Sequence, residues 1–267
     1  MKLFALVVLF ALTGIAAGQK KPAIPEDLLD DEHFRTESGL NEYTVPSIAK
    51  IFDELEKVAP LVYDSAHLKN HERLPLDRSK LALRLGTLIA DGFLAVQTGN
   101  SQDVEQISAH LLRYAKALGA GDRIKKHVAA LLEHAKAQNL NKLKLALAAT
   151  QRDVERELVG LRDPDLSHLI SLGGWVEALD SAALAVQKKF TPERALTLFR
   201  EDVADYYSES IGSLHPTISR QKHMIEMQEL LQGLRTSMAL GEDVKPTVAE
   251  VEEVTKIAAK LVKIAQN

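Results

Sequence analysis

Apolar residues recur at three- and four-residue spacing along almost the whole chain beyond Ser47, and this is the period of an amphipathic α-helix. No stretch shows the strict alternation of a half-buried strand. The first helical stretch starts at Val45 and is expected to continue to His71. Eight further stretches carry the same pattern: 77–98, 101–118, 122–137, 140–161, 164–188, 192–208, 218–240 and 247–265. The pattern therefore predicts an all-α fold of about nine helices.

Residues at the ends of these stretches support the division into helices. Thr191 precedes Pro192, which is the order of an N-cap followed by proline in the first helical turn. Gly119 lies where a helix should end, and Thr247 with Glu250 has the spacing of a capping box. The connections are mostly short, so consecutive helices should be antiparallel neighbours. We expect an irregular antiparallel bundle or array.

One short internal sequence repeat indicates a second possible architecture. Residues 111–117, LLRYAKA, are matched by 131–137, LLEHAKA. Such a repeat would suit an α-solenoid, in which one helical hairpin stacks on the next. The repeat does not continue along the chain and the helix starts are unevenly spaced, so the irregular array remains the favoured prediction.

The amino-terminal residues 1–18 have the pattern of a secretory signal peptide. Lys2 gives a short positive start, Leu3 to Leu12 is an apolar core of about ten residues, and Ala16-Ala17-Gly18 supplies small residues for cleavage. A membrane-spanning helix needs about 20 apolar residues, and the polar run at 19–21 comes too soon. We expect a periplasmic or secreted protein with no membrane span after cleavage.

Residues 19–46 form an acidic, proline-containing segment that reads as a flexible arm. It carries three prolines and a cluster of acids at 27–32, with too few apolar residues to pack by itself. The remaining residues, 47–267, are expected to form a single all-helical domain.

Composition narrows the classes of function. The chain has no cysteine, which excludes disulfide scaffolds, thiol catalysis and cysteine-ligated zinc. With 267 residues, of which 46% are hydrophobic, it can bury a sizeable core without disulfides. The net charge of −4 becomes one unit more negative when Lys2 is lost with the signal peptide. Binding of nucleic acid requires a basic surface, and the chain is acidic overall, so we expect no nucleic-acid partner.

A polar stripe crosses the most apolar internal stretch of the chain. On a helix over 77–98, Arg84, Thr87 and Asp91 fall on one narrow face, while Leu, Ile, Phe and Val cover the rest. This face is either the solvated edge of a central helix or the lining of a groove that binds a polar ligand. Gly86 and Gly92 lie off the stripe and suggest that other helices approach closely.

The single tryptophan, Trp175, follows Gly173 and Gly174 in the middle of a predicted helix. Two mid-helix glycines cost about 1 kcal/mol each relative to alanine, so something should pack against them. The simple interpretation is a close helix crossing with Trp175 filling the core. The alternative is a kink that opens a ligand pocket with Trp175 as its apolar wall.

A metal site is the second candidate. Asp64, His67 and His71 could face one metal ion if the first helix continues through them, because His67 and His71 are four residues apart. The alternative is a solvated pair at a polar helix end. No histidine has a glutamate three residues before it, which argues against a di-iron bundle but leaves a haem or single-metal bundle open.

Motifs of catalysis are missing. The chain has no His-Glu-x-x-His, no G-x-S-x-G elbow, no phosphate loop and no dinucleotide fingerprint. In the stretch 200–210, REDVADYYSES, Val203 with Tyr206 or Tyr207 continues the apolar core stripe, so the acids are most simply the solvated face of the helix. A cation site on these acids is the alternative, although the dense oxygen ligation of calcium or magnesium is missing. The segments RLGTLIADGFLAVQ and LRDPDLSHLISLGGW, with the leader, resemble exported all-helical proteins of Gram-negative bacteria that carry no assigned function. That resemblance implies the compartment and the fold class, and no catalytic residue.

These observations favour an exported protein that binds a ligand or a protein partner, as carrier or scaffold, without catalysis. The identities of the ligand, the partner and any cofactor are open. A metal- or haem-binding bundle and an enzyme of unrecognised class are the alternatives.

Overall fold

The computed structural model describes Asp27 and residues 45–267 of the chain. Residues 1–26 and 28–44 lie outside the described part, so the signal peptide and most of the arm stay predictions. Every regular element of residues 45–267 is helical, and nine of the α-helices have eight or more residues, which confirms the predicted all-α fold. These nine are α2 (Ile48–Leu55), α3 (Arg78–Gln97), α4 (Val104–Leu118), α5 (Gly121–Lys136), α6 (Leu140–Gly160), α7 (Asp165–Lys188), α9 (Glu201–Ser213), α11 (Lys222–Met238) and α12 (Val248–Gln266).

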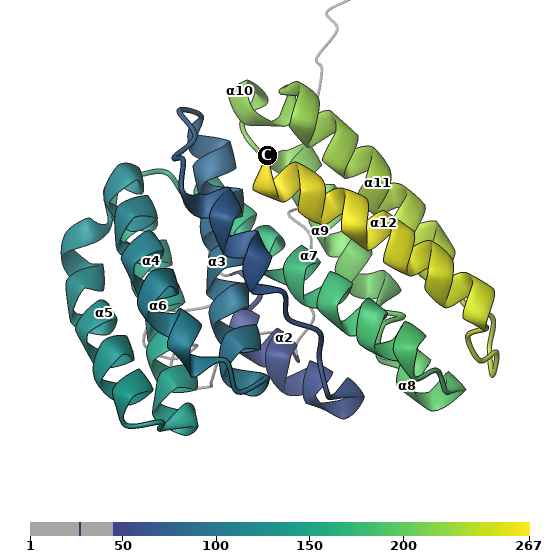
Figure 1. The fold of residues 1–267 in the computed structure, drawn as a ribbon. Coiled ribbons are helices and arrows are strands. Elements are labelled where there is room, and N and C mark those ends of the chain that lie inside the picture. The colour runs from purple at the N-terminus through teal and green to yellow at the C-terminus, as the bar shows by residue number, and fades with distance from the viewer. Residues whose placement is uncertain (1–26, 28–44) are drawn as a thin grey trace, which may run out of the picture.

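The helices form two groups that meet along α3 and α7 (Figure 1). Helices α3, α4, α5 and α6 pack successively side by side, and α7, α12, α11 and α9 form the second group. The most extensive helix–helix contact of the described chain joins α3 to α7. One buried core continues through both groups, from Ile48 to Ala265.

Glycines bring α3 and α7 into backbone contact. A Cβ atom built on Gly86 of α3 would lie 1.9 Å from the carbonyl oxygen of Ile170, and one on Gly173 of α7 would lie 2.1 Å from that of Leu83. Any side chain at either position would therefore meet the opposite backbone. The close helix crossing is therefore confirmed, and helix α7 continues without a break through Gly173.

The amino-terminal end of the domain is fixed to this centre. Ser171 of α7 donates its hydroxyl hydrogen to the Pro46 carbonyl at 2.7 Å, and the Gln151 side chain accepts from the Ile48 amide at 3.0 Å. Val45 is also buried. The last two residues of the predicted arm therefore belong to the packed domain.

The first predicted helix is interrupted, which corrects the expectation for 45–71. Helix α2 ends at Leu55 and is followed by the short 3-10 helices η2 (Glu56–Val58) and η3 (Ser65–His71). Pro60 explains the break, because proline lacks an amide hydrogen and disfavours helical geometry in the residue before it.

The stretch predicted as one helix over 192–208 is also divided. It forms α8 (Pro192–Leu196) and the start of α9, with residues 197–200 between them. Glu201 and Asp202 open α9, where their negative charge favours the positive end of the helix dipole. The short α10 (Pro216–Ser219) then precedes α11.

Three of the predicted helix ends are confirmed. Thr191 caps α8 by accepting from the Arg194 amide, with Pro192 in the first turn. Gly119 ends α4 with a φ of 97°, and Thr247 and Glu250 form the capping box of α12.

Among the described helices α7 alone is long and apolar enough to cross a membrane. In the fold, 89% of the most apolar 18-residue stretch of α7 is buried inside the protein, as expected of a core helix.

Candidate functional site

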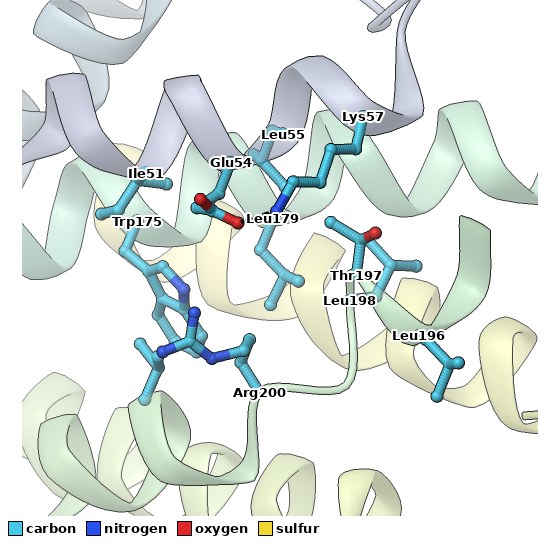
Figure 2. Close-up of a pocket in the computed structure, with 11 residues that line it drawn as sticks. Ile51, Glu54, Leu55, Lys57, Trp175, Leu179, Leu196, Thr197, Leu198 and Arg200 are labelled. Carbon is cyan, nitrogen blue, oxygen red and sulfur yellow. Dashed lines mark hydrogen bonds and ion pairs between the residues drawn. The ribbon is translucent and has the colours of Figure 1, made fainter. Parts of the chain in front are cut away.

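A pocket of about 300 Å³ opens where α2 and η2 face α7, α8 and the start of α9 (Figure 2). It lies beside Trp175, the residue that the sequence marks as a possible ligand wall. Its volume is at the lower end of the range of small-molecule sites. Eleven residues line it: Ile51, Glu54, Leu55, Lys57, Trp175, Leu179, Leu196, Thr197, Leu198, Arg200 and Val203.

The walls of the pocket are mainly apolar and firmly held. Trp175 is only 5% exposed and stacks on Tyr207 of α9, with ring centroids 5.0 Å apart. The Tyr207 hydroxyl in turn lies 2.7 Å from the hydroxyl of Ser171. Because the indole is held by this contact and by the α7 backbone, it presents a preformed apolar surface to the pocket.

Charged side chains enter the pocket from opposite sides. Glu54 and Lys57 come from the α2–η2 side and form an ion pair with each other, while Arg200 comes from the segment that precedes α9 (Figure 2). A few charged groups around apolar walls are the usual composition of a site that orients a small molecule.

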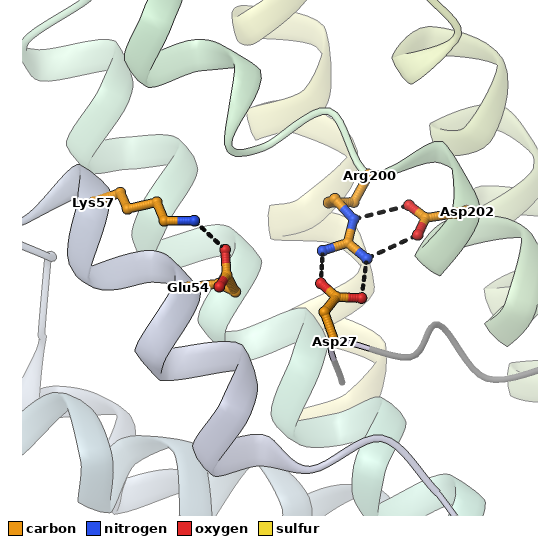
Figure 3. Close-up of polar contacts among 5 residues, drawn as sticks. All are labelled: Asp27, Glu54, Lys57, Arg200 and Asp202. Atoms are coloured by element: carbon orange, nitrogen blue, oxygen red, sulfur yellow. Dashed lines mark hydrogen bonds and ion pairs between the residues drawn. The ribbon is translucent and has the colours of Figure 1, made fainter. Parts of the chain in front are cut away.

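Arg200 is held by two carboxylates, one near in sequence and one remote (Figure 3). Asp202 accepts from Nε at 2.9 Å and from Nη2 at 2.8 Å. Asp27 accepts from Nη1 at 2.6 Å and from Nη2 at 3.0 Å. The hydrogen bonds to Asp202, and then those to Asp27, raise the pKa of Arg200. The same contact with Arg200 lowers the pKa of Asp202.

The polar stripe of α3 lies in a different place, and the structure does not bring it together with Trp175. None of its three candidates lines the pocket. Arg84 donates from Nη1 to the carbonyl oxygens of Asn70 and Arg73, at 3.2 and 2.9 Å. Thr87 is buried and donates its hydroxyl hydrogen back to the Arg84 carbonyl.

Asp91 is not on a solvated edge, because η3 and α4 cover this side of α3. Its side chain is 1% exposed and lies 3.5 Å from Nε2 of His71, which is fully buried. The ring of His71 contacts Tyr114 of α4 edge-on and lies 6.2 Å from the ring of His110. Asp91 from the predicted polar stripe and His71 from the predicted metal site therefore lie together in one buried cluster.

The predicted metal site loses its helical basis, because residues 65–71 form the 3-10 helix η3 and not a continuation of the first α-helix. Asp64 accepts from the Ala66 amide and caps η3, so its carboxylate serves the local backbone. In a 3-10 helix of three residues per turn, positions four apart no longer share a face. The side chain of His67 lies outside the described part. Among the described residues no group of three or more His, Asp or Glu could hold a metal ion.

The buried cluster should make stability depend on pH through His110. Burial, with His71 and Arg113 close by, lowers the pKa of His110 below its ordinary value of 6.5, against a smaller opposite effect of Glu72. The unfolded chain then binds more protons, so the free energy of unfolding should fall as the pH drops below about 6.5. We expect the free energy of unfolding, measured with urea from roughly pH 5 to pH 7, to depend less steeply on pH for His110→Asn than for the unmodified chain. The same dependence on pH in both chains would contradict this role of His110.

Sequence reasoning missed Arg200, Lys57 and Glu54. The helix predicted over 192–208 gives Arg200 no special role, whereas in the structure Arg200 follows a break at 197–199 and lines the pocket. The signal that could have marked it is the pair of acids at 201–202, which is typical of a helix start.

Comparisons with protein-family models, with curated proteins and with solved structures find no match to this chain. The resemblance to exported helical proteins therefore stays a prediction, and so does export.

Proposed function

We propose that this chain is an exported protein that binds a small, mainly apolar molecule in the pocket beside Trp175 and does not convert it. The observation that carries the proposal is a cavity of about 300 Å³ whose apolar wall is preformed and whose charged residues stand at its sides. Burial of apolar ligand surface supplies about 25 cal/mol per Å², so such a wall can retain a small molecule without covalent chemistry.

The charged residues of the pocket support binding over catalysis. Glu54 is paired with Lys57, and Arg200 is paired with two carboxylates. Groups engaged in this way can orient a polar end of a ligand. A nucleophile with an adjacent base and a third orienting group, which covalent catalysis requires, is not among the residues that line the pocket.

The first test uses the neutral dye N-phenylnaphthylamine and the single tryptophan. We expect saturable binding at one site, with loss of Trp175 emission as the dye fluoresces, because Trp175 lines the pocket. Thr197→Phe places a ring at the partly buried pocket wall and should weaken dye binding about tenfold or more by removing free volume. The measurement is a fluorescence titration, with thermal unfolding to verify the fold.

Thr236→Phe is the matched control for this variant. Thr236 is exposed on α11, and its hydroxyl bonds only within that helix, to the Gln232 carbonyl. Dye binding should be unchanged there. Failure of the dye to bind, or equal affinities in both variants, would overturn the proposed function.

A further inference from the structure

We infer that the molecule bound in this pocket is an amphipathic carboxylate, and that Asp27 occupies the place of its carboxylate when the pocket is empty. The inference rests on the proposed function and adds the chemical class of the ligand and a competing group within the chain. It is carried by the contact of Asp27 with Arg200 across 173 positions of sequence.

The Arg200 guanidinium binds one carboxylate on each of two edges. Asp202, two residues away, takes the edge formed by Nε and Nη2. Asp27 takes the other edge, formed by Nη1 and Nη2, in the parallel two-bond geometry that arginine offers to carboxylates. A carboxylate from outside the chain can use that second edge without disturbing Asp202.

The charged residues that line the pocket are Glu54, Lys57 and Arg200, and Asp202 and Asp27 join them only through their contacts with Arg200. Glu54 and Lys57 cancel, and Arg200 is already balanced by Asp202. Asp27 is therefore the surplus negative charge (Figure 3). Exchange of Asp27 for one ligand carboxylate leaves the net charge unchanged, whereas a neutral headgroup would leave the Nη1 edge without its charged partner.

Apolar side chains near Arg200 can hold the rest of the ligand. Arg200 lines the same pocket as Trp175, Leu179 and Leu198, so a chain or ring attached to the carboxylate can lie on these apolar side chains (Figure 2). The apolar part then adds a favourable contribution that Asp27 lacks, because the short aspartate side chain buries little apolar surface.

The contact of Asp27 with Arg200 is weak enough to be exchanged. The Asp27 side chain is 45% exposed and that of Arg200 28%, so solvent screening reduces the contribution of this two-bond ion pair. Because Asp27 is tethered to the same chain, it still competes at a raised effective concentration. Its removal should increase the apparent affinity for a carboxylate about three- to tenfold.

The experiment measures displacement of N-phenylnaphthylamine by octanoate and by octanol, in chains that carry the amino-terminal arm. We expect octanoate to compete more strongly than octanol in the unmodified chain. Asp27→Asn should improve octanoate competition about three- to tenfold and leave octanol unchanged. Arg200→Gln should weaken octanoate at least tenfold, again without effect on octanol. Octyl sulfate provides a test of whether any anionic headgroup suffices.

Two controls separate the possible failures. Asp30→Asn removes the same charge from the same acidic stretch, so it distinguishes the Arg200 contact from the overall charge of the arm. If the dye binds but octanoate and octanol compete equally in the unmodified chain and in Arg200→Gln, the carboxylate class is wrong while the pocket remains a binding site. Equal affinities of Asp27→Asn and the unmodified chain for octanoate, or octyl sulfate competing as well as octanoate, would also overturn the inference. If the dye fails to bind, the proposed function itself is wrong.

Discussion

Gly173→Ala should lower the free energy of unfolding by about 3 kcal/mol, although alanine is the better helix former. The new Cβ atom would lie 2.1 Å from the carbonyl oxygen of Leu83, and a backbone atom of a packed helix cannot move aside alone. Helices α3 and α7 would have to separate along the most extensive contact of the described fold. Urea unfolding followed by circular dichroism measures the change.

Gly233→Ala is the matched control for this prediction. Gly233 lies within α11, and nothing stands within 4 Å of a Cβ atom built on it. The same substitution should there raise the free energy of unfolding by about 1 kcal/mol, because alanine is favoured in helices. Two variants with the same sign would contradict the assignment of Gly173 to a close helix crossing.

Gly86→Ala adds an internal check on the same contact. Its Cβ atom would meet the Ile170 carbonyl at 1.9 Å, so it should destabilise the chain as Gly173→Ala does. Once either variant has separated α3 from α7, the second should cost less. The double variant is therefore expected to lose less stability than the sum of the two singles, as neighbouring substitutions that share a displacement do.

The helical nature of the fold could be predicted because it depends on local periodicity. Amphipathic stretches, the caps at Thr191 and Thr247 and the glycine at 119 are each determined by residues within one or two turns. The break after α2 could also have been predicted, since Pro60 stands in the middle of the expected helix. The break at 197–200 is harder to predict, because Thr-Leu-Phe-Arg contains neither glycine nor proline and only the two acids at 201–202 indicate a new helix start.

The candidate site was predicted only in part because it depends on contacts between remote segments. The position of Trp175 beside two glycines pointed to a special environment, and Trp175 lines the pocket. Arg200 gained its position from the interrupted helix, and its contact with Asp27 joins segments that no local pattern relates. The helical period predicts that Arg84, Thr87 and Asp91 share a face, but which element covers that face depends on tertiary packing.

Asp91→Ala should be the most destabilising of these changes, with a loss of about 4 kcal/mol of unfolding free energy. Asp91 and His71 are buried together, and removing one partner of a buried pair leaves the other in surroundings arranged for the pair. Asp163→Ala breaks an exposed pair with Arg78 and should cost less than about 1 kcal/mol. In a cycle with His71→Leu and Asp91→Leu, the double variant should be more stable than the sum of the single changes predicts, by about 1 to 3 kcal/mol. Additive losses, or equal losses for Asp91→Ala and Asp163→Ala, would show that η3 is held on α3 mainly by its other contacts, such as the Arg84 hydrogen bonds to Asn70 and Arg73.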